Sequence, residues 1–191
     1  MTDAMKRERE TWWVLRAQSG DTEALDELLK AVEEPLYRYV LSMVRESYLA
    51  EDILQEVFLR VYRKLRWLRE PELFRPWAYR IASRETFRHL RREREWTEQV
   101  RDEAALEVIP AATTSEEFAP ELIAQLPLLV AQVSPASRAV VVLYYLHELS
   151  LEEVAEVLDI PLGTVKSRLS YGLESLRRQM RSGTHQRSGG K

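Results

Sequence analysis

A chain of 191 residues can hold one ordinary domain or two small ones, and its 45% hydrophobic and 31% charged residues are typical of a water-soluble globular protein. The absence of cysteine excludes disulfides, thiolate metal sites and cysteine nucleophiles. The N-terminal sequence MTDAMKRERE has no apolar run typical of a signal peptide, and the longest apolar stretch, AVVVLYYL, is far shorter than a membrane span, so we expect a cytoplasmic protein without direct membrane insertion.

Residues 10–95 are predicted to form successive helices. Over 21–44, apolar side chains recur every three or four positions behind Asp21, a residue type that favours the N-cap. Pro35 lies inside this stretch and is expected to kink or split the helix, because proline lacks a backbone N–H. A second helix is predicted over 48–68 and a third over 74–95, with Pro76 near its first turn.

The second of these helices has two different faces. Its predicted buried residues are Ile53, Leu54, Val57 and Val61. The other side carries Asp52, Gln55, Glu56 and Leu59. An apolar residue on a polar face suggests a protein contact surface, although a solvated face with one stray leucine explains the same pattern more simply.

Charge is unevenly distributed along the chain, although the net charge is only −3. Residues 75–94 hold seven arginines and two glutamates, and residues 163–181 carry a local charge of +4. Between them, residues 97–126 carry −6, lose the helical periodicity and contain two prolines, which predicts a flexible acidic linker. Two basic segments favour a nucleic-acid partner, while each alone fits a solvated helix face equally well.

Aromatic residues are interleaved with the first basic segment. They are Trp67, Phe74, Trp77, Tyr79 and Phe87. Planar side chains among cations suit unstacked single-stranded bases. Packing in the core is the alternative interpretation for Phe74 and Trp77.

Residues 127–182 carry the pattern of a helix-turn-helix unit. Ser150 and Glu153 form a capping box, so a short helix is expected from Leu151, followed by a turn over 159–163 and a second helix. The exposed face of that second helix is expected to present Thr164, Lys166, Ser167, Arg168, Ser170 and Tyr171. Lysine and arginine beside a helix N-terminus place positive charge next to the positive end of the helix macrodipole. This unfavourable arrangement indicates that the helix binds a negatively charged partner, for which a phosphate backbone is the obvious candidate. A structural αα-hairpin is the alternative, and residues 183–191 are expected to be a disordered tail.

Three sequence stretches together carry a resemblance to a known family. AEDILQEVFLRVYRKL, FRPWAYRIASRETFRHLRR and LSLEEVAEVLDIPLGTVKSRLSYGLESLRR are similar to regions 2.2, 2.3–2.4 and 4 of the extracytoplasmic-function (ECF, group IV) sigma factors of bacterial RNA polymerase. The resemblance implies an all-α fold of two small helical domains. Region 2 would occupy 10–96 and the helix-turn-helix region 4 would occupy 127–182, joined by the flexible acidic linker 97–126.

The resemblance also implies roles for individual residues. Those matching the contact with the polymerase β′ clamp helices are Asp52, Gln55 and Glu56, with Leu59 on the same face. Those matching the loop and helix that hold melted −10 DNA are Trp67, Leu68, Arg80, Arg84, Arg88, Arg91 and Arg92. Those matching the reading of −35 duplex DNA are Lys166, Ser167, Ser170 and Tyr171, with Thr164 and Arg168 alongside.

The implied function is a transcription initiation factor that binds RNA polymerase core, including the β flap, and promoter DNA. An anti-sigma factor commonly holds such proteins. No enzymatic activity, small-molecule substrate, cofactor or metal is expected.

Two other functions compete with this one. A free-standing helix-turn-helix repressor would bind a palindrome without polymerase. An enzymatic function would use Glu51, Asp52 and Glu56 as metal ligands. No histidine joins these carboxylates in the sequence, because the three histidines, His89, His147 and His185, are scattered along the chain.

Overall fold

The computed structural model describes residues 3–96, 130 and 133–187, and every regular element in those residues is helical. The chain divides into two compact units, Met1–Glu98 and Gln99–Lys191, and each is described by itself. The prediction of an all-α protein with two helical domains is confirmed for the described part of the chain. The predicted linker, residues 97–126, lies outside the described residues.

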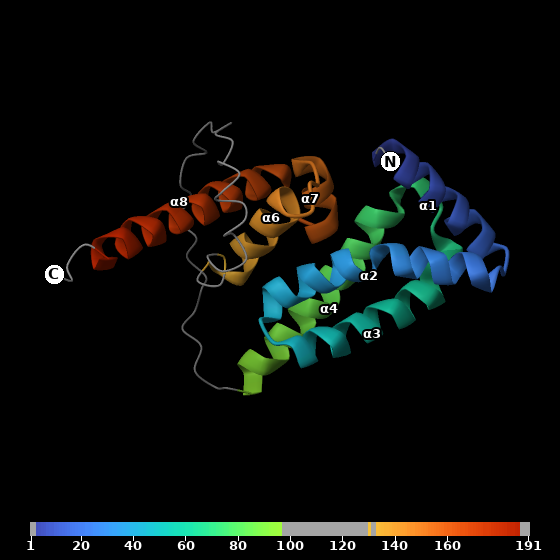
Figure 1. Ribbon diagram of the computed structural model, residues 1–191, viewed down its shortest axis with the longest axis horizontal. Helices are drawn as coiled ribbons and strands as arrows, with labels where there is room; N and C mark the ends of the chain where they lie inside the picture. The colour runs from blue at the N-terminus through green and yellow to red at the C-terminus, as the bar shows by residue number, and fades with distance from the viewer. Residues whose placement is uncertain (1–2, 97–129, 131–132, 188–191) are drawn as a thin grey trace. The chain divides into compact units, whose positions relative to one another are not determined.

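Unit 1 is built around one central helix (Figure 1). Its elements are α1 (Asp3–Gln18), α2 (Thr22–Val44), α3 (Ser47–Lys64), the short 3₁₀ helices η1 (Leu65–Trp67) and η2 (Pro71–Leu73), and α4 (Phe74–Trp96). Helix α2 packs against α1, α3 and α4. Each of these three helices therefore has one face toward α2.

The start of α2 follows directly from its sequence. The Asp21 carboxylate accepts a hydrogen bond from the Ala24 N–H at 3.0 Å, so the predicted N-cap is confirmed. The helix then continues through Pro35 as one element, so the proline does not split it. Val32 and Leu36 on either side of the proline are buried, and this packing outweighs the loss of one backbone hydrogen bond.

Helix α1 begins earlier than the predicted run of helices, at Asp3 rather than near residue 10. Val14 is completely buried and anchors the helix in the core of unit 1. Glu10 is also buried, and its carboxylate receives two hydrogen bonds from Arg75 at the start of α4. The local sequence MKRERETWW does not predict this packing, because it contains few apolar residues.

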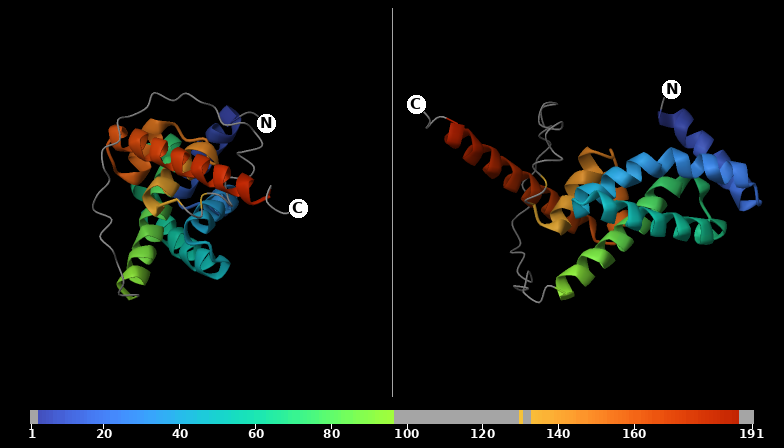
Figure 2. Two further views of the ribbon diagram at one scale, coloured as in Figure 1. Left: turned by 90° about the vertical axis from the view of Figure 1, so that its left-hand side faces the viewer. Right: turned by 60° about the horizontal axis from the view of Figure 1, so that its bottom comes forward.

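Unit 2 consists of α6 (Pro135–Tyr145), α7 (Leu151–Leu158) and α8 (Leu162–Arg187). Buried residues 139–143 of α6 form the centre of its core. The buried Arg138 donates hydrogen bonds to the carbonyls of Val130 and Val133, so its guanidinium holds the backbone inside the unit. The C-terminal part of α8 extends past α6 and α7 (Figures 1 and 2).

Residues 183–187 continue α8, where a disordered tail was predicted, and 188–191 lie outside the described residues. A helix that is already nucleated extends easily, since each added residue contributes one hydrogen bond.

A close approach of α6 and α8 depends on Gly172. A Cβ at this position would lie 2.6 Å from Cγ2 of the buried Val141, well inside contact distance. Gly163, near the start of the same helix, has no atom within 4 Å of such a Cβ. The two glycines therefore offer a matched test of helix packing.

We expect Gly172→Ala to destabilise unit 2 by about 1–3 kcal/mol, because overpacking forces the two helices apart. Gly163→Ala should be neutral or stabilise by up to about 1 kcal/mol through helix propensity. Hydrogen exchange of the α6 amides measures both effects. Equal protection of α6 in the two variants would contradict the packing argument.

Candidate functional site

The outer face of α3 carries an exposed row of side chains. Ile53, Leu54, Val57 and Val61 are buried, as predicted. Asp52 and Gln55 are exposed on the opposite side, and Leu59 is 54% exposed. No packing within unit 1 explains why a leucine stands in this position.

Two tyrosines that the sequence interpretation missed extend this row. Tyr48 is 70% exposed and Tyr62 is 65% exposed. Spacings of four, three, four and three residues place Tyr48, Asp52, Gln55, Leu59 and Tyr62 along one side of the helix, and we call these residues the α3 stripe. The same helical spacing in the sequence was the signal that could have found the tyrosines.

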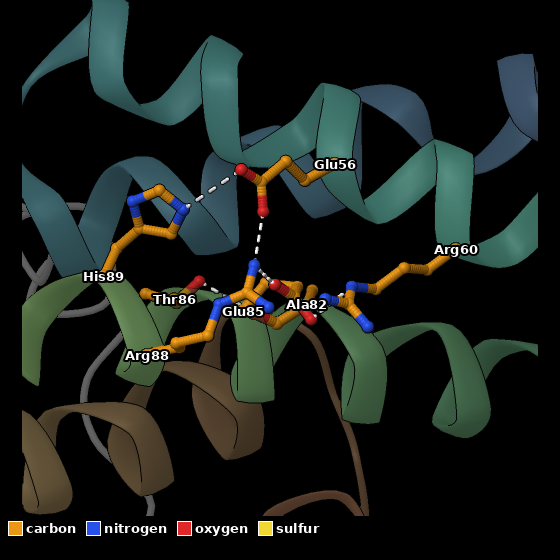
Figure 3. A network of polar contacts seen from close by, with 7 residues as sticks. All are labelled: Glu56, Arg60, Ala82, Glu85, Thr86, Arg88 and His89. Carbon is orange, nitrogen blue, oxygen red and sulfur yellow. Dashed lines mark hydrogen bonds and ion pairs between the residues drawn. The ribbon is translucent and has the colours of Figure 1, made fainter. Parts of the chain in front are cut away.

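Glu56, at the edge of the stripe, faces α4 and takes part in a network of charges (Figure 3). One of its carboxylate oxygens contacts the Arg88 guanidinium, and the other lies 3.6 Å from Nε2 of His89. The nearly buried Glu85 carboxylate contacts Arg88 as well, and Arg60 of α3 at 2.5 Å. Two residues with different expected partners, Glu56 for polymerase and Arg88 for DNA, are thus in contact with each other.

The network favours the ionised form of Glu56. Partial burial raises the pKa of its carboxyl, but the charges of His89 and Arg88 outweigh this effect and hold that pKa below its ordinary value. A charged Glu56 can attract a cationic partner and Arg88 at the same time.

The connection between α3 and α4, residues 65–73, presents one aromatic ring. Trp67 is 61% exposed, and the Arg66 guanidinium lies over its ring at 3.9 Å from the centroid. Leu68 is half-buried. An exposed indole with a neighbouring cation can stack on a base and contact its phosphate.

The other aromatic residues of this region contribute to the core more than to a surface. Phe74 and Tyr79 are buried, and Tyr79 packs edge-on against Tyr39 of α2 at 5.8 Å between ring centroids. The core alternative is therefore correct for Phe74, while Trp77 is half-buried. Among these aromatic residues, all of which lie in the described part of the chain, Trp67 is the one with an exposed ring.

The arginines of α4 differ in their surroundings. Arg84, Arg91 and Arg92 are exposed, whereas Arg80 and Arg88 are half-buried. Exposed arginines can attract phosphates from solvent. The charge of Arg88 is balanced by Glu56 and Glu85.

Helices α7 and α8 form the predicted helix-turn-helix. The capping box is confirmed, because the Ser150 hydroxyl accepts from the Glu153 N–H at 3.1 Å and the Glu153 carboxylate accepts from the Ser150 N–H at 2.8 Å. Asp159 ends α7 in the left-handed conformation at φ 57°, and α8 begins at Leu162. The turn is shorter than the predicted 159–163, so Gly163 lies in the first turn of α8.

The start of α8 has a basic outer face. Lys166 is exposed and Tyr171 is 38% exposed, while Thr164, Ser167, Arg168 and Ser170 are half-buried. Burial lowers the pKa of the Arg168 guanidinium, and its Nε has no hydrogen-bond partner among the described residues. No acidic residue lies in the first turn, so the positive end of the helix is not neutralised there.

The described residues contain no cluster of three or more potential metal ligands. In the same part of the chain, no helix is both long and apolar enough to cross a membrane.

Two family models match the two units in order. Residues 28–96 match the model for Sigma-70 region 2, and residues 129–178 match the model for Sigma-70, region 4. Both regions on one chain define a transcription initiation factor of the sigma-70 class.

Comparison with related proteins identifies the family within this class. The ECF RNA polymerase sigma factor SigW of Bacillus subtilis is 29% identical over 177 residues, which cover 88% of this chain and 95% of SigW. The RNA polymerase sigma factor CarQ of Myxococcus xanthus is 30% identical over 165 residues, covering 85% of this chain and 92% of CarQ. The chain belongs to the ECF family of RNA polymerase sigma factors, and it directs the polymerase to promoters.

Solved structures show the same fold at low identity. CnrH, solved in complex with the cytosolic domain of CnrY, superposes with a TM-score of 0.67 at 20% identity and covers 91% of this chain and 98% of its own. The sigma factor RpoE of Bartonella quintana, solved in complex with the anti-sigma factor NepR, gives a TM-score of 0.63 at 17% identity and covers 82% of this chain and 96% of its own.

The Glu85 network can be tested through stability. We expect Glu85→Gln to cost about 2–3 kcal/mol, less than the ~3–5 kcal/mol of a fully buried pair, because Arg60 and Arg88 are partly exposed and can rehydrate. Glu34→Gln, which breaks an exposed pair with Arg38, should cost at most about 0.5 kcal/mol.

All five tryptophans lie in unit 1, so tryptophan fluorescence during urea unfolding reports on this unit alone. A loss for Glu85→Gln no larger than that for Glu34→Gln would show that the network does not stabilise the α3–α4 packing.

Proposed function

We propose that this sigma factor divides promoter recognition among three surfaces. The α3 stripe binds polymerase core, the α3–α4 connection and the arginines of α4 hold melted −10 DNA, and the first turns of α8 read −35 duplex DNA. The exposed α3 stripe carries the proposal, because the fold of unit 1 does not use these side chains.

The composition of the α3 stripe supports docking on a protein. Aromatic residues are enriched at protein interfaces, and exposed polar residues between them add directional contacts. Tyr48, Leu59 and Tyr62 would supply apolar contacts, with Asp52 and Gln55 between them. The family resemblance directs this face to the β′ clamp helices, with Glu56 at its edge.

The −10 surface combines a stacking ring with cations. Trp67 would stack on an unpaired base, beside Leu68 and Arg66. Among the α4 candidates, the exposed Arg84, Arg91 and Arg92 would contact phosphates. Arg80 and Arg88, which are half-buried, would support the helix beside the strand.

The −35 surface is the basic start of α8. Lys166 would contact the phosphate backbone, and Ser167, Arg168, Ser170 and Tyr171 would face base edges in the major groove, beside Thr164. The short turn and the capping box support a rigid presentation of this helix.

The proposed partners are RNA polymerase core, including the β flap, and promoter DNA, so the protein would act in the cytoplasm without catalysing a reaction itself. An anti-sigma factor is a further expected partner, in line with the family resemblance.

The first experiment measures core binding. The triple variant Asp52→Ala, Gln55→Ala and Leu59→Ala should bind polymerase core at least about tenfold more weakly, since interface residues of this kind contribute ~1–2 kcal/mol or more. Run-off transcription should fall accordingly. Glu56 is left unchanged, because its loss would also disturb Arg88.

The matched control is Lys30→Ala, Glu33→Ala and Glu34→Ala on the exposed side of α2, which should bind core as the unmodified protein does. Unchanged core binding by the α3 variant would contradict the docking proposal. A footprint on DNA without polymerase would favour the repressor interpretation instead.

The second experiment tests the −35 surface. Lys166→Ala should weaken binding of the holoenzyme to −35 duplex DNA and reduce the slope of log affinity against log salt by about 1, the effect of one lost phosphate contact. Arg178→Ala, which removes the same charge three turns later, should leave that slope unchanged. Equal slopes for both variants and the unmodified protein would contradict the proposed contact.

A further inference from the structure

Helix α1 lies before the matched region 2, which begins at residue 28, yet it contacts both 3₁₀ helices of the α3–α4 connection. No residue of α1 has a role in the proposed function. Its polar contacts with the connection suggest one.

The side-chain amide of Gln18 uses both of its N–H groups on this connection. Nε2 donates to the Leu65 carbonyl at 2.9 Å and to the Leu68 carbonyl at 2.7 Å. Leu65 caps the C-terminus of α3 and Leu68 caps η1, so both carbonyls belong to helix ends that need donors. The Leu68 N–H also donates to the Leu65 carbonyl, which closes the turn.

The residues between these two carbonyls are Arg66 and Trp67, and both are exposed. Gln18 therefore holds the turn at its two ends and leaves the indole and the guanidinium directed outward. Leu65 is buried at 3% exposure, so the turn is also anchored from inside.

The other end of the connection is held by the same helix. Glu10 accepts from Nε of Arg75 at 2.7 Å and from Nη2 of Arg75 at 2.5 Å, and its side chain is only 7% exposed. Arg75 is the second residue of α4. Two residues of α1 thus contact the chain on both sides of residues 66–74.

We propose that α1 positions the single-strand-binding connection, with Gln18 as the positioning residue that presents Trp67 to an unpaired base. This proposal rests on the proposed −10 function of Trp67. Preorganising an aromatic ring increases affinity, because less conformational entropy is lost when the strand binds.

The test compares Gln18→Glu, Gln18→Leu, Trp67→Ala and the double variant Gln18→Glu/Trp67→Ala. Gln18→Glu keeps the shape but replaces two donors with acceptors, and Gln18→Leu removes the donors without adding charge. The control is Ser19→Ala, since the Ser19 hydroxyl, directly after α1, donates to the Leu15 carbonyl of that helix and not to the connection. Each variant is assembled with polymerase core, and binding of a fluorescent single strand carrying the −10 element is measured by anisotropy beside core affinity.

We expect each Gln18 variant and Trp67→Ala to weaken strand binding about tenfold, the effect of one base–aromatic stacking contact, with core affinity and the Ser19→Ala control unchanged. The double variant should bind no more weakly than Trp67→Ala alone, because Gln18 acts through that ring.

Four results would overturn the inference. Additive losses in the double variant would show that Gln18 does not act through Trp67. Equal losses of core and strand binding would show that Gln18 only stabilises unit 1. Unchanged strand binding in Trp67→Ala would contradict the proposed −10 function of the connection itself. A loss of strand binding in Trp67→Ala without a loss in the Gln18 variants would contradict only the positioning role of Gln18.

Discussion

Burial of the apolar face of α2 is the constraint on which unit 1 depends. Leu28, Leu36 and Val40 are at most 1% exposed, and α1, α3 and α4 pack around this helix. Each surrounding helix must turn its apolar side inward, so its remaining side chains are displayed outward by default. The α3 stripe, the exposed α4 arginines and the outer residues of α1 all follow from this arrangement. The display of these side chains is therefore a consequence of helix packing around one centre.

Electrostatic pairing then determines which charges remain available on unit 1. Glu85 is nearly buried and holds Arg60 and Arg88, so part of the basic character of α4 is neutralised by the protein itself. The same network joins α3, which would bind polymerase, to α4, which would hold DNA (Figure 3). In unit 2 the division is similar. Arg138 donates hydrogen bonds to two backbone carbonyls inside the unit, whereas Lys166 is exposed at the surface.

Three features of unit 1 differ from what the sequence predicted. Pro35 was expected to kink or split a helix, and it does not split it, because packing on both sides of the proline keeps the helix continuous. The early start of α1 was missed because its anchoring residues, Glu10 and Val14, are too sparse to form an apolar pattern. Tyr48 and Tyr62 were overlooked although they share the helical spacing of the α3 stripe, and their exposure agrees with the surface position that this spacing indicates.

Local features were readable from the amino-acid sequence: the helical class, the Asp21 cap, the Ser150–Glu153 capping box and the buried side of α3. Each depends on residues within a turn or two of one another, where helical periodicity and capping chemistry operate. The contacts between Glu56 and Arg88, 32 residues apart, and between Gln18 and Leu68, 50 residues apart, were not readable in this way. They depend on the angle and register at which distant helices pack, and a single sequence carries no local signal for that geometry.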